Sequence, residues 1–162
     1  MHHQTFRLFD ASECKDLISE LDEKLGPSSA SDECDRLRVR NSDLSDLVKQ
    51  KLPDLCDIVD GDFSLSPLWF YTRYGPGAGL SPHYDGQFKF GDQTSVATLL
   101  VYLNDDFEGG ETAFLDDDEN VLSEVVPVAG MALILRQDSY HMAAAVTKGA
   151  KYLLRTDVMR RN

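Results

Sequence analysis

The amino-acid sequence predicts a mainly β protein of the sandwich or jelly-roll class, supported by helices near the N-terminus. Aromatic residues favour strands and glycines favour turns, and both types are concentrated after residue 62. Of all the aromatic residues and glycines, only Phe6, Phe9, Gly26 and Gly61 precede that point. Beyond it, short apolar stretches bounded by Gly, Asp or Asn recur about every 8–15 residues, a spacing typical of two-sheet β folds.

The chain has the length of one domain. Its 162 residues lie within the ~50–250 residues usual for a domain. We therefore expect a single domain over residues 1–162, in which residues 1–62 form helical support and residues 63–162 form the β core that carries the chemistry.

The composition argues against several classes of partner. The formal net charge of −12 repels polyanions, so neither nucleic acid nor an anionic membrane is expected as a partner. No apolar run approaches the ~20 residues of a membrane helix. The first residues contain no apolar segment of the kind found in secretory signals, so we expect a cytoplasmic protein. Cys14, Cys34 and Cys56 lack zinc-ligand spacing and receive no role.

Two helices are predicted before residue 62. The first begins after Asp10, whose carboxylate can cap it, and ends at Gly26. Its apolar residues recur at helical spacing, at Cys14, Leu17, Ile18, Leu21 and Leu25. The second helix is capped at Ser42 and interrupted at Pro53, and a short strand at Leu37–Arg40 precedes it.

Eight strands are predicted after residue 62. We expect them at Phe63–Tyr74, Leu80–Asp85, Ser95–Leu103, Glu111–Leu115, Val121–Pro127, Met131–Arg136, Tyr140–Val146 and Lys151–Met159. The intervening loops Gly86–Gln93 and Asp116–Asn120 are expected to cover the open end of the fold, where a site is usually built.

Two histidines and an aspartate are the candidate metal ligands. Residues two apart on a strand share a face, so His83 and Asp85 point the same way. With His141 they make a three-ligand set, which suits ferrous iron with open positions or zinc with one open position. Chance proximity is the alternative for the first pair, and a half-buried core histidine is the alternative for His141. We expect His2 and His3 to belong to a flexible terminus.

A cationic pair follows the last of these histidines. Alternation along the final strand places Lys151, Leu153, Arg155 and Asp157 on one face. Cations on a buried β face need anionic partners, and a dicarboxylate cofactor can supply one. The alternative is an edge strand whose charges face water.

Six segments of the second part occur in a distinctive order: Arg73–Gly77, Leu80–Asp85, Ala97–Asn104, Phe107–Phe114, Val126–Leu133 and His141–Val158. Together they resemble the 2-oxoglutarate- and Fe(II)-dependent dioxygenases of the prolyl 4-hydroxylase-like branch. The resemblance implies a double-stranded β-helix, which is a cupin-like jelly roll. It also implies that His83, Asp85 and His141 bind Fe(II).

The resemblance further implies the residues that bind 2-oxoglutarate. Lys151 is expected to pair with the distal carboxylate of this cofactor, and Tyr74 and Thr98 are expected to hydrogen-bond the same group. Arg155 points the same way as Lys151, so it is expected either to share the cofactor carboxylate or to clamp the substrate.

The activity implied is hydroxylation of an unactivated C–H bond by O2, coupled to decarboxylation of 2-oxoglutarate to succinate and CO2, with ascorbate as an optional reductant. Peptidyl proline is the first substrate class, and a free amino acid or small metabolite is the alternative. Three more distant alternatives are a zinc hydrolase with the same ligands, a non-catalytic cupin-like binding or sensor module, and a nucleic-acid demethylase, which the net charge disfavours. The oligomeric state is left open.

Overall fold

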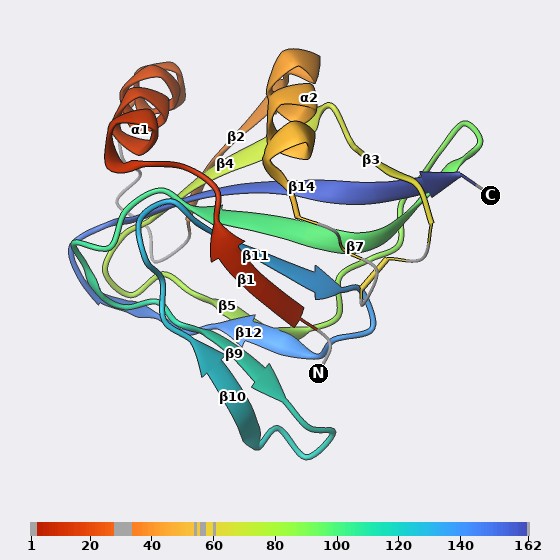
Figure 1. The fold of residues 1–162 in the computed structure, drawn as a ribbon. Coiled ribbons are helices and arrows are strands. Elements are labelled where there is room, and N and C mark those ends of the chain that lie inside the picture. The colour runs from red at the N-terminus through yellow and green to blue at the C-terminus, as the bar shows by residue number, and fades with distance from the viewer. Residues whose placement is uncertain (1–2, 28–33, 54, 56–57, 60, 162) are drawn as a thin grey trace.

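The structure, a computed structural model, describes residues 3–27, 34–53, 55, 58–59 and 61–161, and the chain forms three layers (Figure 1). Helices α1 (Ala11–Leu25) and α2 (Ser42–Lys51) lie on one face of a large antiparallel sheet. A smaller antiparallel sheet lies on the opposite side. The predicted mainly β jelly roll with helical support is therefore confirmed.

The major sheet has eight strands, with the central order β1-β11-β7-β14-β4-β2. Two short strands extend it, because β3 pairs with β14 and β6 pairs with β7. The bounds are β1 (His3–Arg7), β2 (Asp35–Arg40), β3 (Phe63–Leu65), β4 (Leu68–Tyr74), β6 (Lys89–Phe90), β7 (Gln93–Tyr102), β11 (Met131–Arg136) and β14 (Lys151–Arg161).

The minor sheet has the strand order β10-β9-β12-β5. Its strands are β5 (Leu80–His83), β9 (Thr112–Leu115), β10 (Val121–Val125) and β12 (His141–Ala143). A separate pair joins β8 (Glu108–Gly109) to β13 (Val146–Lys148).

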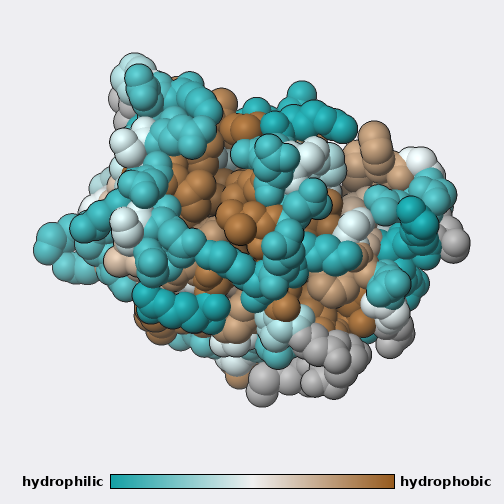
Figure 2. Space-filling view, turned by 45° about the horizontal axis from the view of Figure 1, so that its top comes forward, coloured by the Kyte–Doolittle hydropathy of each residue, from teal (hydrophilic) through white to brown (hydrophobic). Residues whose placement is uncertain are grey.

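Strand alternation divides the core into two parts. Trp69, Tyr71 and Leu154 belong to the cluster that packs under the helices. Leu100 and Leu153, from the other face of the major sheet, pack between the two sheets. Figure 2 turns the helix-bearing side forward and shows hydrophobic residues at its centre, with hydrophilic residues around them. The opposite face of the major sheet, which looks toward the minor sheet, carries the side chains that line the cavity described below.

The local signals for α1 are confirmed in detail. The Asp10 carboxylate accepts hydrogen bonds from the backbone N–H groups of Ser12 and Glu13, at 2.8 and 2.9 Å, and the Glu13 side chain accepts from the Asp10 N–H. Helix α2 starts at Ser42, one residue earlier than predicted, because its cap is Asn41, whose side-chain oxygen accepts from the Leu44 N–H at 2.9 Å. Asparagine is at least as good a cap as serine, which explains the shift.

Two predicted strands are interrupted. The strand expected at Phe63–Tyr74 breaks at Ser66-Pro67, where proline lacks the N–H that a central ladder requires. The strand expected at Tyr140–Val146 divides into β12 and β13, which pair with different partners.

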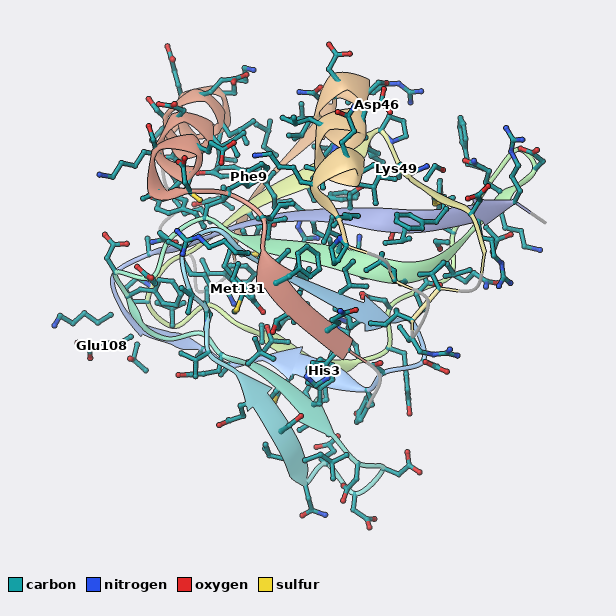
Figure 3. All side chains as sticks on the ribbon, in the orientation of Figure 1. His3, Phe9, Asp46, Lys49, Glu108 and Met131 are labelled. Carbon is teal, nitrogen blue, oxygen red and sulfur yellow. The ribbon has the colours of Figure 1, made fainter. Side chains whose placement is uncertain are left out.

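The N-terminal part supplies strands as well as helices. The strand predicted at Leu37–Arg40 is part of β2, which forms one edge of the major sheet, whereas β1, which pairs with β11, was not predicted. The prediction of a flexible terminus was wrong for His3, which stacks on Phe114 with ring centroids 4.0 Å apart (Figure 3). His2 and Cys56 lie outside the described residues. Neither helix is both long and apolar enough to cross a bilayer.

We expect Gly130→Ala to destabilise the fold strongly. Gly130 has φ +79°, and a Cβ built there lies 2.0 Å from the Phe9 carbonyl oxygen, a backbone atom that cannot rotate away. The loss in free energy of unfolding should be about 2–4 kcal/mol, measured by urea denaturation. Gly86→Ala is the control, since a Cβ at Gly86 meets nothing within 4 Å. Equal stability of the two variants would contradict the close approach of chain segments at Gly130.

Candidate active site

Three candidate metal ligands come together at the edge of the minor sheet. Strands β5 and β12 are antiparallel neighbours, and their register places His141 opposite His83. Asp85 follows β5 by two residues, and one ligand atom from each of the three side chains lies within 4.8 Å of the others. Asp85 Oδ1 is 3.7 Å from His83 Nε2, and Asp85 Oδ2 is 3.9 Å from His141 Nε2. The prediction that His83 and Asp85 point the same way is consistent with this compact cluster, which His141 completes.

The same backbone device orients both imidazoles. His83 Nδ1 lies 2.8 Å from the Ser81 carbonyl oxygen, and His141 Nδ1 lies 2.9 Å from the Ser139 carbonyl oxygen. A carbonyl oxygen only accepts, so each Nδ1 carries a proton and Nε2 is the nitrogen left to bind a metal. A carbonyl partner behind a histidine is the usual support for a metal ligand.

The electrostatics of the cluster also suit a cation. Burial of Asp85 opposes its ionisation, but the His83 contact, the Arg155 charge and the Thr98 hydroxyl outweigh burial and hold its pKa below the ordinary value. Burial lowers the pKa of His141, which keeps this imidazole neutral. The contact with Asp85 raises the pKa of His83, so the carboxylate favours a positive charge beside it. Two imidazole nitrogens and one carboxylate match the 2-His-1-carboxylate set of non-haem Fe(II) sites. The residues present therefore fit a divalent iron ion.

Thr98 supports the aspartate and does not reach the far end of the site. Its hydroxyl donates a hydrogen bond of 2.6 Å to Asp85 Oδ2. On the neighbouring strand β14 it lies in register with Asp157, six residues from Lys151, which is about 20 Å along a strand. The structure thus contradicts the expectation that Thr98 hydrogen-bonds the same carboxylate as Lys151.

Arg155 also lies at the metal end. Its Nη2 is 3.5 Å from Asp85 Oδ1 and 3.2 Å from Asp157 Oδ1, and the guanidinium covers the Phe70 ring. Burial raises the pKa of Asp157. These contacts place Arg155 beside the candidate metal ligands, four strand positions from Lys151.

A cavity of about 280 Å³ extends from the metal ligands between the two sheets. Lys151 lines it with a side chain only 1% exposed, and its ammonium donates a 2.6 Å hydrogen bond to the Gly110 carbonyl oxygen. The ammonium forms no ion pair with any carboxylate of the described residues, and it lies 5.3 Å from the ring centroids of both Tyr74 and Tyr102. Burial lowers the pKa of Lys151 to about 8. A buried cation with spare donors fits an anionic group such as a carboxylate.

Thr112 is a cavity residue that sequence analysis missed. It is buried, it lines the same cavity as Lys151, and its hydroxyl lies 2.7 Å from the Tyr102 hydroxyl. Burial raises the pKa of Tyr74 to about 12, so its cavity-lining phenol stays protonated. Thr112 could have been found only from strand pairing. It lies two residues from Phe114, which is the partner of His141 on the neighbouring strand.

The two loops predicted to cover the site do not line this cavity. Phe88 and Phe90 line a separate small apolar pocket of about 80 Å³ beside Leu68 and Met159. The Asp116 carboxylate accepts hydrogen bonds from backbone and side-chain N–H groups of Asn120. The acidic loop therefore organises its own turn between β9 and β10.

Most of the β core matches a known protein family. The model of the 2OG-Fe(II) oxygenase superfamily matches residues 69–156. A PKHD-type hydroxylase of Picosynechococcus sp. is 33% identical over 82 residues, which are 50% of this chain and 36% of that protein. The chain thus spans only about a third of the length of this relative.

Solved structures show the same fold over nearly the whole chain. A viral collagen prolyl hydroxylase from Paramecium Bursaria Chlorella virus-1 superposes with a TM-score of 0.74 at 20% identity, covering 98% of this chain and 96% of the viral one. A prolyl-4-hydroxylase from Pseudomonas putida has a TM-score of 0.69 at 18% identity, covering 100% of this chain and 95% of the other.

We expect Thr98→Val to weaken divalent metal binding, because the Asp85 carboxylate loses the hydroxyl that orients it. Loss of such a supporting bond costs roughly 10–100-fold in metal affinity. The measurement is a calorimetric titration with Mn(II). Thr5→Val, an exposed position on β1, is the matched control and should bind Mn(II) like the parent. Parent-like binding by Thr98→Val would show that Asp85 needs no such support.

Proposed function

This chain belongs to the 2OG-Fe(II) oxygenase superfamily, and from that premise we propose that it is a 2-oxoglutarate-dependent hydroxylase of the prolyl 4-hydroxylase-like type. One observation carries the proposal: a single cavity has two imidazoles and a carboxylate at one end and a buried ammonium without a carboxylate partner at the other. A zinc hydrolase needs the metal ligands but gives no reason to bury that ammonium.

His83, Asp85 and His141 are proposed to hold Fe(II). Both histidines present Nε2 because their Nδ1 protons are engaged by backbone carbonyl groups. Asp85 stays ionised, and Thr98 restrains one of its oxygens while Arg155 approaches the other. A bound Fe(II) would have three protein ligands and could also bind a chelating co-substrate and O2.

Lys151 is proposed to pair with the distal carboxylate of 2-oxoglutarate. Tyr74 lies in register with Lys151 on the adjacent strand, so its hydroxyl can donate to the same carboxylate. Thr112 replaces Thr98 in this role, since it lines the cavity from the opposite sheet. Fixing one end of the cofactor in this way restricts its orientation at the other end.

When bound, Fe(II), 2-oxoglutarate and O2 supply the oxidation, in which the keto acid is decarboxylated to succinate and CO2 while a substrate C–H bond is hydroxylated. The protein holds these groups and limits water. Leu100 and Leu153 form apolar cavity walls between the charged ends. Arg155 lines the same cavity beside Asp85, where it is positioned to contact a bound substrate.

Several finer assignments belong to the same proposal. Peptidyl proline is the first substrate class, with a free amino acid or small metabolite as the alternative. Residues 1–162 act as one domain, with residues 63–162 as the catalytic core. Ascorbate as a reductant and a cytoplasmic location also belong to this proposal.

Succinate release in the presence of Fe(II), 2-oxoglutarate and O2 tests the activity. We expect Asp85→Ala to reduce the rate at least about a hundredfold, because the anionic ligand is lost. Asp117→Ala removes an exposed carboxylate from the β9–β10 turn and should keep the parent rate. Parent-like turnover by Asp85→Ala would refute the assigned metal site.

The affinity for 2-oxoglutarate should depend on pH through Lys151. Below its pKa of about 8 the ammonium is present and affinity is constant. Above that pH the ammonium is lost in the free protein, and affinity should fall by up to about tenfold per pH unit. Calorimetry with the Mn(II)-loaded protein measures this profile.

Lys151→Met should weaken binding about 10–100-fold and flatten the profile above pH 8. Lys148→Met is the matched control, because Lys148 is exposed and pairs with Glu108. If the affinity of Lys151→Met for 2-oxoglutarate still falls above pH 8 as in the parent, the titrating group is not Lys151.

A further inference from the structure

Strand β2 presents a row of three arginines beside the cavity. Leu37 and Val39 point toward the helices and pack on the core there. The alternate residues Arg36, Arg38 and Arg40 are exposed and belong to the other face of the sheet, which lines the site. Arg36 lines the active-site cavity, whereas Arg40 lines the small apolar pocket of Phe88 and Phe90. We call these three residues the arginine row.

The arginine row has no carboxylate partner among the residues that the structure describes. The chain carries 28 acidic residues against 16 basic ones, yet in the described part of the chain no arginine of the row forms an ion pair. The contrast is Arg73, on the opposite face of the adjacent strand, which pairs with both Asp22 and Asp35. Arg36 hydrogen-bonds the Cys34 sulfur at 3.8 Å. The row is therefore a local exception to the acidic charge of the chain, and the guanidinium groups of Arg38 and Arg40 remain available to an external anion.

The row lies close to the candidate iron ligands. Arg38 is in register with Phe70 on β4, and Phe70 is in register with Arg155 on β14. Two strand spacings of ~4.8 Å separate Arg38 from Arg155, and Arg155 contacts Asp85. A chain-like anionic molecule bound along β2 is thus close enough to place one of its own groups in the cavity beside Asp85.

We propose that β2 binds an extended, acidic polypeptide segment that delivers its target residue to the cavity. This inference rests on the proposed hydroxylase function and assigns its substrate class as an acidic peptide. Alternate side chains on β2 repeat about every 6.6–6.8 Å, and acidic side chains at alternate positions of an extended peptide repeat at the same distance. Charge-assisted pairs with guanidinium groups then fix the register of the peptide.

Two features favour a peptide over a small anion or nucleic acid. Strand β2 is an edge of the major sheet, and no strand of the described residues pairs with its outer side. Its outward backbone groups can therefore bind another strand, which a nucleic acid cannot provide. The row also spans about 13 Å, longer than a small metabolite, and ends at an apolar pocket that can hold one side chain.

Direct binding of labelled peptides tests the proposal without requiring turnover. The probe is a fluorescein-labelled peptide of alternating proline and glutamate, compared with its proline–glutamine counterpart by fluorescence anisotropy. We expect the parent protein to bind the glutamate peptide more tightly. Arg38→Ala and Arg40→Ala should each weaken that binding roughly tenfold. Arg7→Ala, on β1 at the opposite edge of the sheet, is the matched control and should bind normally.

Three outcomes would overturn the proposal. The first is equal binding of the two peptides, and the second is parent-like binding by both arginine variants. The third is binding of inorganic phosphate or single-stranded DNA to the same residues more tightly than the glutamate peptide. Mn(II)-dependent binding of 2-oxoglutarate, measured on the same variants, separates this failure from failure of the proposed function. That binding should survive in Arg38→Ala whether or not the peptide binds, whereas its absence from the parent protein would refute the hydroxylase assignment itself.

Discussion

The antiparallel register of β5 and β12 is the constraint on which the site depends. It places His141 opposite His83, and the backbone carbonyl two residues before each histidine engages its Nδ1. Both rings therefore present the same nitrogen toward Asp85. Because strand pairing and main-chain hydrogen bonds create this arrangement, the metal ligands are oriented before any ligand binds.

Charge is separated along the cavity. The metal end holds an ionised carboxylate supported by Thr98 and approached by Arg155, and the far end holds the buried ammonium of Lys151. A molecule that chelates a cation and carries a second carboxylate satisfies both ends at once. The arginine row lies on the edge strand β2 and meets this cavity at Arg36, which lines it. It gives the acidic protein one local surface on which an anionic substrate is attracted.

Strand periodicity made much of this arrangement predictable. Alternation identified β11 at its observed bounds and correctly placed Lys151 and Arg155 on one face. Register was the missing information, because pairing partners are set by the whole fold. The resemblance assigned Thr98 to the far end of the cavity, whereas its hydroxyl bonds Asp85, and Thr112 was not identified. The arginine row was visible in the Asp35–Arg40 alternation, but its exposure near a cavity depends on β2 pairing with β4.

Anaerobic addition of Fe(II) and 2-oxoglutarate to the protein measures the central claim most directly, since the chelate absorbs visible light only when both groups share one site. The account predicts a visible charge-transfer band for the parent protein and its loss in His141→Ala. A colourless parent mixture, or a band that persists unchanged in that variant, would contradict the assignment of these residues to an iron and 2-oxoglutarate site.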